Sequence, residues 1–217
     1  MNRTARGFTL VEVAVVVAII AVVAALAFSS VSPMRSRAKL QGSSAELSAL
    51  LHNARQSALA TGRHTVVMFF PDQANSEGGV GRVVVYEDAA SNFFAAASNP
   101  NFEGWDATKL PGGASSLAGH LDLPVGVRFS LAGLTAPTFP APFAAVTAAA
   151  CGFCGTGGDH RGAIRFDSLG RAAFFDGNGA PIDLPGASVG LSGASIAGVQ
   201  FLIVSPATGA VKAHNHG

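Results

Sequence analysis

Charged residues are scarce in this chain of 217 residues: they make up 12% of it, whereas hydrophobic residues make up 49%. Soluble domains carry about 25% charged residues, so part of this chain is not an ordinary water-exposed surface. Cysteine is also scarce, with two residues, which excludes a disulfide-rich scaffold. We find no internal repeat with a period of about 20–50 residues, which excludes a solenoid. The length suits one domain with an appendage.

The few charges are unevenly distributed along the chain. Residues 1–63 hold seven basic and two acidic residues, a net charge of +5, whereas residues 64–217 hold seven basic and eleven acidic residues, a net charge of −4. Phosphate groups are attracted to basic surfaces, so the acidic C-terminal part is poorly suited to bind nucleic acid.

A long apolar run lies near the N-terminus. Residues 8–28 are apolar or small apart from Thr9 and Glu12, and as a helix they would span about 30 Å, the thickness of the hydrocarbon core of a bilayer. A plain transmembrane anchor fits this run. A secretory signal peptide also fits, because the run has a basic start and an Ala-Leu-Ala cleavage site that ends at Ala27. Neither interpretation accounts for Glu12, because a carboxylate inside a spanning helix costs a few kcal/mol and neither an anchor nor a signal peptide needs one.

The stretch Gly-Phe-Thr-Leu-Val-Glu, which begins at Gly7, resembles the class III signal of type IV pilins and pseudopilins. The resemblance implies that residues 1–7 are a leader peptide, that a prepilin peptidase cuts between Gly7 and Phe8, and that it then N-methylates Phe8. It also implies that Glu12 is an assembly residue whose carboxylate offsets the Phe8 amine of a neighbouring subunit. Residues 8–28 would cross the bacterial inner membrane in a single pass and enter the filament core after assembly.

Pro33 follows the apolar run and should bend or locally open the helix. A helical pattern resumes after it. Apolar side chains recur on one face at spacings of three, four and seven residues: Leu40, Leu47, Leu51, Ala54 and Ala58. Gly62 is a good C-terminal stop. We therefore predict an amphipathic stem helix over residues 29–62 whose apolar stripe packs on a sheet.

Residues 63–217 are predicted to form a β-rich globular head. Alternating or β-branched runs predict strands at 64–70, 81–87 and 126–131, hairpins at 163–175 and 199–214, and shorter strands near 181 and 187. One long helix followed by such strands predicts an α+β fold with an antiparallel sheet packed on the stem. Two stretches rich in Ala, Gly, Ser and Pro, near 88–122 and 132–162, are interpreted as insertions.

The order of these elements resembles the GspH/FimT-type minor pseudopilins. The resemblance rests on the Ala-Arg-Gln-Ser-Ala stretch at 54–58, the hairpin at 163–172 and the closing hairpin at 201–212. It implies a structural subunit of a type IV pilus or a type II secretion filament, with its head in the periplasm, and neither an enzyme nor a cofactor-binding protein. Its implied partners are other pilins, through the N-terminal helix, and the prepilin peptidase.

Two motifs in the head have simple interpretations. Cys151-Gly-Phe-Cys154 has the spacing of a redox motif, but the glycine-rich sequence after it will not readily start the helix that a thioredoxin-like site needs. A short-loop disulfide is the preferred interpretation, since two cysteines do not complete a zinc site. The stretch from Asp176 to Asp183 departs from a calcium loop at its fifth and sixth positions, so we predict a tight turn there and no metal.

DNA binding is an alternative function. Some minor pilins of the family that this chain resembles bind DNA through basic residues near the C-terminus. The corresponding hairpin here offers only Lys212, His214 and His216, and the two histidines are expected to lie in a disordered tail. We therefore do not expect nucleic acid to be a partner.

Overall fold

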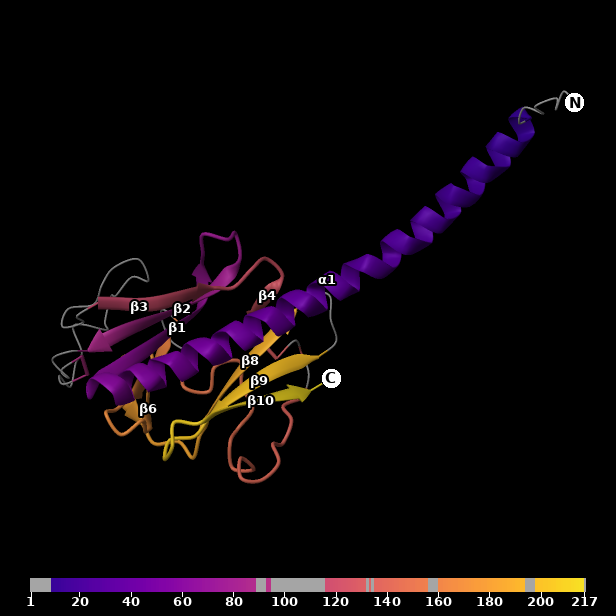
Figure 1. Ribbon diagram of the computed structural model, residues 1–217. Helices are drawn as coiled ribbons and strands as arrows, with labels where there is room; N and C mark the ends of the chain where they lie inside the picture. The colour runs from indigo at the N-terminus through magenta and orange to yellow at the C-terminus, as the bar shows by residue number, and fades with distance from the viewer. Residues whose placement is uncertain are drawn as a thin grey trace, which may run out of the picture.

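The chain forms a long helix that projects from a β-rich head (Figure 1). The computed structural model describes residues 9–88, 93–94, 116–131, 133, 135–155, 160–193 and 198–216, with backbone alone for 26–33 and 116. The helix α1 covers Leu10–Thr61, and the strands are β1 (His64–Ala74), β2 (Val80–Asp88), β3 (Ser116–Asp122), β4 (Val127–Phe129), β5 (Gly162–Phe166), β6 (Ala172–Phe175), β7 (Pro181–Ile182), β8 (Ala187–Gly193), β9 (Val199–Val204) and β10 (Val211–His216). The predicted α+β fold is confirmed.

The helix α1 is continuous from Leu10 to Thr61. It runs through Pro33, so the helix does not open there; a proline inside a long helix is compatible with a continuous, bent helix. Gly62 ends the helix as predicted. Its φ of 68° lies in the left-handed region, and its N–H donates to the carbonyl oxygen of Ala58 at 3.0 Å.

The strands form two antiparallel sheets rather than one. The six-stranded sheet has the order β3-β2-β1-β5-β6-β7, and the four-stranded sheet has the order β10-β9-β8-β4. In the larger sheet Val67 of β1 lies opposite Val85 of β2 on one side and Ile164 of β5 on the other. The stem contacts strands of both sheets, so it is the shared layer that joins them.

The predicted apolar stripe of the stem lies in the core. Its members are at most 4% exposed: Leu40, Leu47, Leu51, Ala54 and Ala58. They pack against the inward-facing side chains of both sheets, which include Val67 and Phe69 of β1 and Leu202 of β9. Burying a large apolar side chain stabilises a fold by about 1.5–3 kcal/mol, so the stem is part of the head and not an attachment to it.

Segments that the sequence suggests are insertions cover the outer faces of both sheets. Phe94 stacks on Phe175 at the outer face of the larger sheet, with ring centroids 3.7 Å apart. Phe139 packs edge-on against Phe201 at the outer face of the smaller sheet, with centroids 5.3 Å apart. Strand β3, which the sequence does not predict, takes up the last residues of the first stretch. The described parts of both stretches therefore complete the core.

The end of the stem is tied to two hairpin turns. Arg55 Nε donates to the carbonyl oxygen of Gly170, in the turn between β5 and β6, at 3.2 Å. Gly209, in the turn between β9 and β10, approaches the same carbonyl so closely that a Cβ would collide with it. Its φ is 61°, which also favours glycine. One arginine of the stem thus fixes the place where the two sheets meet.

Arg82 of β2 and Asp122 of β3 form a bidentate ion pair. Arg82 Nε lies 2.6 Å from Asp122 Oδ1, and Arg82 Nη2 lies 2.7 Å from Oδ2. Ser76 Oγ also donates to Oδ2, at 2.7 Å. The hydrogen bonds from Arg82 are the main cause that lowers the pKa of Asp122 to about 2. The ionised carboxylate therefore stabilises the fold at pH values above the ordinary pKa of aspartate. This contribution is lost as the pH falls toward about 2.

We expect Asp122→Asn to lower the free energy of unfolding at neutral pH by about 1–2 kcal/mol, because it weakens charged hydrogen bonds. The difference from the wild type should shrink as the pH falls from about 4 toward about 2. Urea unfolding at several pH values measures both effects. Glu87→Gln is the control, since Glu87 pairs with an Arg63 side chain that is 53% exposed, and exposed pairs contribute little. Equal stability of Asp122→Asn and the wild type would contradict the prediction.

Candidate functional site

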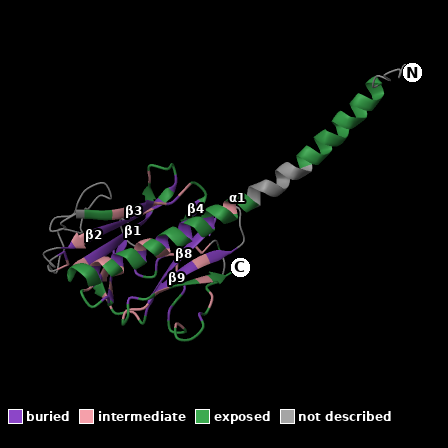
Figure 2. Cartoon of the chain, in the orientation of Figure 1, coloured by how far each residue is buried: buried purple, intermediate pink, exposed green. Residues whose placement is uncertain are grey.

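The N-terminal part of α1 is exposed on all sides. Every side chain from Leu10 to Ala25 is exposed (Figure 2). Apart from Glu12, the large ones are apolar: Leu10, Val11, Val13, Val15, Val16, Val17, Ile19, Ile20, Val22 and Val23. Soluble monomers rarely expose a continuous apolar surface of this extent. Such a segment requires an apolar environment or partner helices.

Within the part of the chain that the structure describes, no helix meets the length and apolarity expected of a membrane span.

Glu12 closes a capping box at the start of α1. Thr9 is the N-cap residue, and its hydroxyl oxygen accepts from the N–H of Glu12 at 3.3 Å. Glu12 Oε2 in turn accepts from the N–H and the hydroxyl of Thr9, both at 2.9 Å. Two backbone donors that a helix start leaves unpaired are thus satisfied. Sequence reasoning misses this role, although the Thr-x-x-Glu spacing is the known signal for it.

The predicted cleavage site lies next to this capping box. Gly7 and Phe8 are outside the described residues, but Thr9 follows them directly, at the end of α1 that lies farthest from the head (Figure 1). The head therefore does not cover this end of the helix. The positive end of the helix dipole also lies here, which favours the carboxylate of Glu12 in the first turn.

Residues 2–28 match the prokaryotic N-terminal methylation motif. This is the type IV pilin-like prepilin signal, and it marks the chain for a prepilin peptidase and for assembly with other pilins. No curated protein and no solved structure matches the chain. The match covers residues 2–7 of the predicted leader and the exposed apolar end of α1, which are the segments that the sequence singles out.

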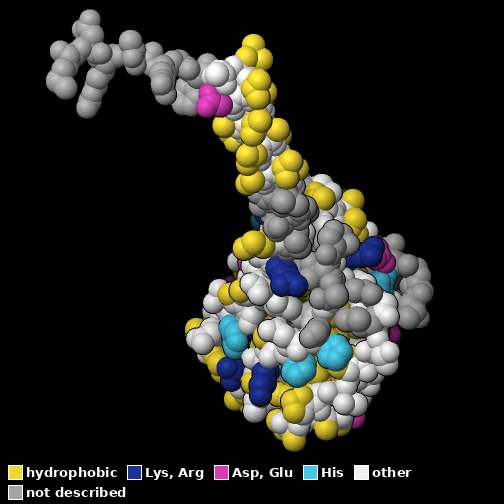
Figure 3. Space-filling view, turned by 90° about the vertical axis from the view of Figure 1, so that its right-hand side faces the viewer, with side chains coloured by type: hydrophobic (Ala, Val, Ile, Leu, Met, Phe, Trp, Pro, Cys, Tyr) yellow, Lys and Arg dark blue, Asp and Glu magenta, His cyan; other side chains and the backbone are white. Residues whose placement is uncertain are grey.

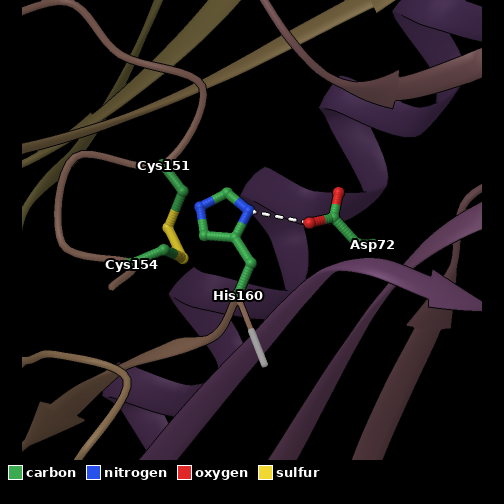
Figure 4. The surroundings of a disulfide bond; sticks show 4 residues. All are labelled: Asp72, Cys151, Cys154 and His160. Atoms are coloured by element: carbon green, nitrogen blue, oxygen red, sulfur yellow. Dashed lines mark hydrogen bonds and ion pairs between the residues drawn. A yellow bond between two sulfur atoms is a disulfide. The ribbon is translucent and has the colours of Figure 1, made fainter. Parts of the chain in front are cut away.

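The β-rich head contains one disulfide among its described residues. Cys151 and Cys154 are joined, with their Cα atoms 5.3 Å apart (Figure 4). Phe153 between them is 1% exposed and packs edge-on against Phe69, with ring centroids 5.1 Å apart. Cys151 also forms a β-bridge with Val189 of β8. The closed loop therefore holds Phe153 in the core and fastens the second insertion to the smaller sheet.

His160 lies beside the disulfide and bonds to Asp72 (Figure 4). His160 Nδ1 lies 3.0 Å from Asp72 Oδ2, and the Asp72 side chain is 76% exposed, so this pair contributes little to stability. In the described part of the chain no helix starts at the cysteines. The arrangement lacks the helix N-terminus that activates a redox cysteine in a thioredoxin-like site. Its geometry supports a structural staple.

We expect the double variant Cys151→Ser/Cys154→Ser to lose about 2 kcal/mol of unfolding free energy, because opening this short loop returns entropy to the unfolded chain. Thermal unfolding by circular dichroism measures the loss. The wild type in excess reductant is the matched control and should melt at the temperature of the double variant. An unchanged melting temperature in both samples would show that the loop is held without the disulfide.

Asp176 caps the predicted tight turn between β6 and β7. Its Oδ1 accepts from the N–H of Asn178 at 2.9 Å and from the N–H of Ala180 at 2.8 Å. One carboxylate oxygen is thus engaged by the backbone of its own turn. Across the described ranges, no three His, Cys, Asp or Glu side chains are grouped to hold a metal ion.

The two C-terminal histidines belong to strand β10, so the expectation of a disordered tail is wrong. His214 lies opposite Phe201 of β9 in the register, and its ring packs edge-on against Phe139 with centroids 5.5 Å apart. Lys212 Nζ lies 5.9 Å from the centroid of the Phe143 ring. These side chains help to hold the second insertion on the outer face of the smaller sheet.

Proposed function

We propose that this chain is a minor pilin or pseudopilin, a non-enzymatic structural subunit of a type IV pilus or a type II secretion filament. The methylation motif on the exposed apolar end of α1 is the observation that carries the proposal. A leader of residues 1–7 is removed, and the new N-terminal residue, Phe8, is methylated. Residues 8–28 hold the subunit in the inner membrane, with the head in the periplasm, until the helix moves into the filament core.

The role of Glu12 in this proposal is to pair with the Phe8 amine of a neighbouring subunit. A charge in lipid is costly unless it has a partner, and the Phe8 amine is a cation at the same end of the helix. Before assembly, the hydrogen bonds from Thr9 satisfy the carboxylate. The pairing then sets the stagger between neighbouring helices, as a buried polar group can set register.

The finer assignment to the GspH/FimT type is also part of the proposal. It is supported by the contact between two of the motifs that suggest it, the end of the stem and the hairpin between β5 and β6. Arg55 of the first motif donates to Gly170 of the second. The closing hairpin, through Gly209, packs on the same carbonyl. The three motifs form one structural unit, which explains why they occur together in a chain of this architecture.

The mature N-terminus tests the proposed function. We expect mass spectrometry of the protein from native membranes to find N-methylated Phe8. A chain that starts at Phe28 would show instead that a signal peptidase cuts after Ala27 and that Glu12 is discarded. A chain that keeps residues 1–7 would show that no prepilin peptidase acts on it. Either of these outcomes would refute the proposal.

A further inference from the structure

Strand β10 forms a long edge of the smaller sheet. The strand order is β10-β9-β8-β4, so within the described residues β10 is paired on one side only. All of its residues, Val211–His216, pair with β9 without a register shift. The strand at the opposite edge, β4, has three residues. Because an edge strand presents unpaired backbone N–H and C=O groups, β10 is the edge of this sheet that offers more of them.

The pairing with β9 fixes which backbone groups of β10 point outward. The N–H of Ser205 donates to the carbonyl oxygen of Ala210 at 3.0 Å. In an antiparallel pair, residues that bond to the partner strand alternate with residues whose backbone groups point away from it. Counting from Ala210, the even-numbered residues of β10 bond to β9, whereas Val211, Ala213 and Asn215 turn their N–H and C=O groups outward. These groups have no hydrogen-bond partner among the described residues.

An open groove of about 580 Å³ lies between the stem and this edge. Small side chains form part of its walls, namely Ala45 and Ser48 of α1 and Ala213 of β10. Ala213 and Asn215 are exposed although they border the groove on the side of the stem. The stem therefore does not cover the edge of β10, and the groove leaves room for the side chains of an added strand.

The surroundings of this edge favour an acidic partner. Lys212, His214 and His216 lie on the outer face of β10, and none of them takes part in an ion pair with another described residue. Among the described residues that line the groove, none is acidic. On the side of the head where β10 ends, histidine, lysine and arginine side chains gather, and acidic ones lie only at the margins (Figure 3).

The alternation along β10 defines the chemistry of the partner. Side chains that lie opposite each other on antiparallel strands share a face, where opposite charges stabilise the pair and like charges destabilise it. An added strand therefore needs acidic side chains opposite Lys212, His214 and His216. Between these positions it needs small or β-branched side chains, because they enter the groove beside the stem.

Two other occupants fit this edge less well. If β10 of a second copy paired with it, the even-numbered residues of both strands would face each other, which places basic side chains opposite basic ones. A lysine on an edge strand commonly prevents such pairing of identical edges. Nucleic acid carries the right charge but lacks the repeating amide N–H and C=O groups that an edge strand bonds. The outward backbone groups thus favour a polypeptide.

We propose that the edge of β10 binds an extended segment of another protein by strand addition, and that acidic residues alternate with small or β-branched residues in this segment. Backbone hydrogen bonds to Val211, Ala213 and Asn215 give affinity, and the alternation gives specificity. The site lies in the head and uses no residue of the methylation motif. It therefore goes beyond the proposed function and gives the head a protein partner of its own.

A synthetic peptide tests this inference. The probe is fluorescently labelled Thr-Glu-Val-Glu-Thr-Glu-Val-Glu, and its binding to the full-length protein in a non-ionic detergent is measured by fluorescence anisotropy at low salt. N-methylation of the Thr and Val amides removes the donors that face β10 in an antiparallel addition and should weaken binding at least about tenfold. N-methylation of the Glu amides is the matched control, because these donors face away. It should change the affinity by less than about threefold.

Variants of β10 test the same edge from the side of the protein. Ala213→Pro removes one outward N–H, a change that an edge strand tolerates, and should weaken binding at least about fivefold. Ala213→Ser keeps the N–H and should bind within about twofold of the wild type. Lys212→Glu should weaken binding of the acidic peptide and improve binding of the same peptide with lysine in place of glutamate.

Several outcomes would overturn strand addition at β10. The first is that the acidic peptide does not bind, and the second is that both methylated peptides bind alike. The second result does not depend on any protein variant, so it decides the matter even if Ala213→Pro fails to fold. A single-stranded oligonucleotide that displaces the peptide, with both methylated peptides bound alike, would show a general anion-binding surface instead. A dimer of the wild type that Ala213→Pro abolishes would show that a second copy occupies the edge.

Discussion

Gly7→Ala should leave the full-length precursor in the membrane, without methylated Phe8. In the family that this chain resembles, the peptidase cuts after a glycine. Glycine also lets the backbone approach an enzyme more closely than any residue with a Cβ. We expect the processed form to fall at least about tenfold, which corresponds to about 1.4 kcal/mol in the barrier of the cleavage step. Intact-mass spectrometry distinguishes the precursor from the product, since they differ by residues 1–7.

Ala5→Ser is the matched control for this variant. It changes a small residue of the leader two positions before Gly7 and should be processed like the wild type. Normal processing of Gly7→Ala would show that the glycine is not part of the cleavage signal, in spite of the match over residues 2–28. Failure of both variants would point to a general defect in membrane insertion and not to cleavage.

Glu12→Val should be cut and methylated normally but should be nearly absent from filaments. In the proposed function, the variant removes the carboxylate that pairs with the Phe8 amine of the neighbour, and an unpaired charge inside an apolar core costs several kcal/mol. We expect its incorporation to fall at least about tenfold. The measurement is the fraction of methylated subunit in sheared filaments, relative to the fraction left in the membrane.

The capping box requires a second variant, because Glu12→Val also removes hydrogen bonds to Thr9. Glutamine serves at this position of a capping box, so Glu12→Gln keeps the cap and loses the charge. If the charge drives assembly, Glu12→Gln should fail like Glu12→Val, and Thr9→Val should still assemble. If Glu12→Gln assembles like the wild type, the residue acts through the helix cap. Unimpaired incorporation of Glu12→Val would refute both roles.

The elements with a strong periodic signal are predictable from the sequence. The stem stripe is found because apolar residues such as Leu47, Leu51 and Ala58 recur with the helical period, and the structure buries all of them. Strands β1, β2 and β9 are found because they are rich in Val, Ile and Phe. Gly62 is found as the helix stop because the left-handed conformation favours glycine.

Other features depend on partners that the local sequence does not reveal. Strand β3 reads Ser-Leu-Ala-Gly-His-Leu-Asp, with few β-forming residues. It is a strand because β2 pairs with it along its length, with one register shift between Val85 and Tyr86 of β2. His214 is in a strand because β9 pairs with it. The division into two sheets follows from which strands meet, and periodicity along the chain does not contain that information. The role of Glu12 in the helix cap is the exception, since its spacing from Thr9 is local.

The stripe of buried side chains along the stem has a mechanical consequence. A pull along the axis of α1 does not peel the helix from the head one residue at a time, because the side chains from Leu40 to Ala58 lie along the direction of the force. It must shear them past strands of both sheets together. The head and the exposed end of α1 therefore form one tensile element, in which force applied to the apolar segment reaches both sheets at once.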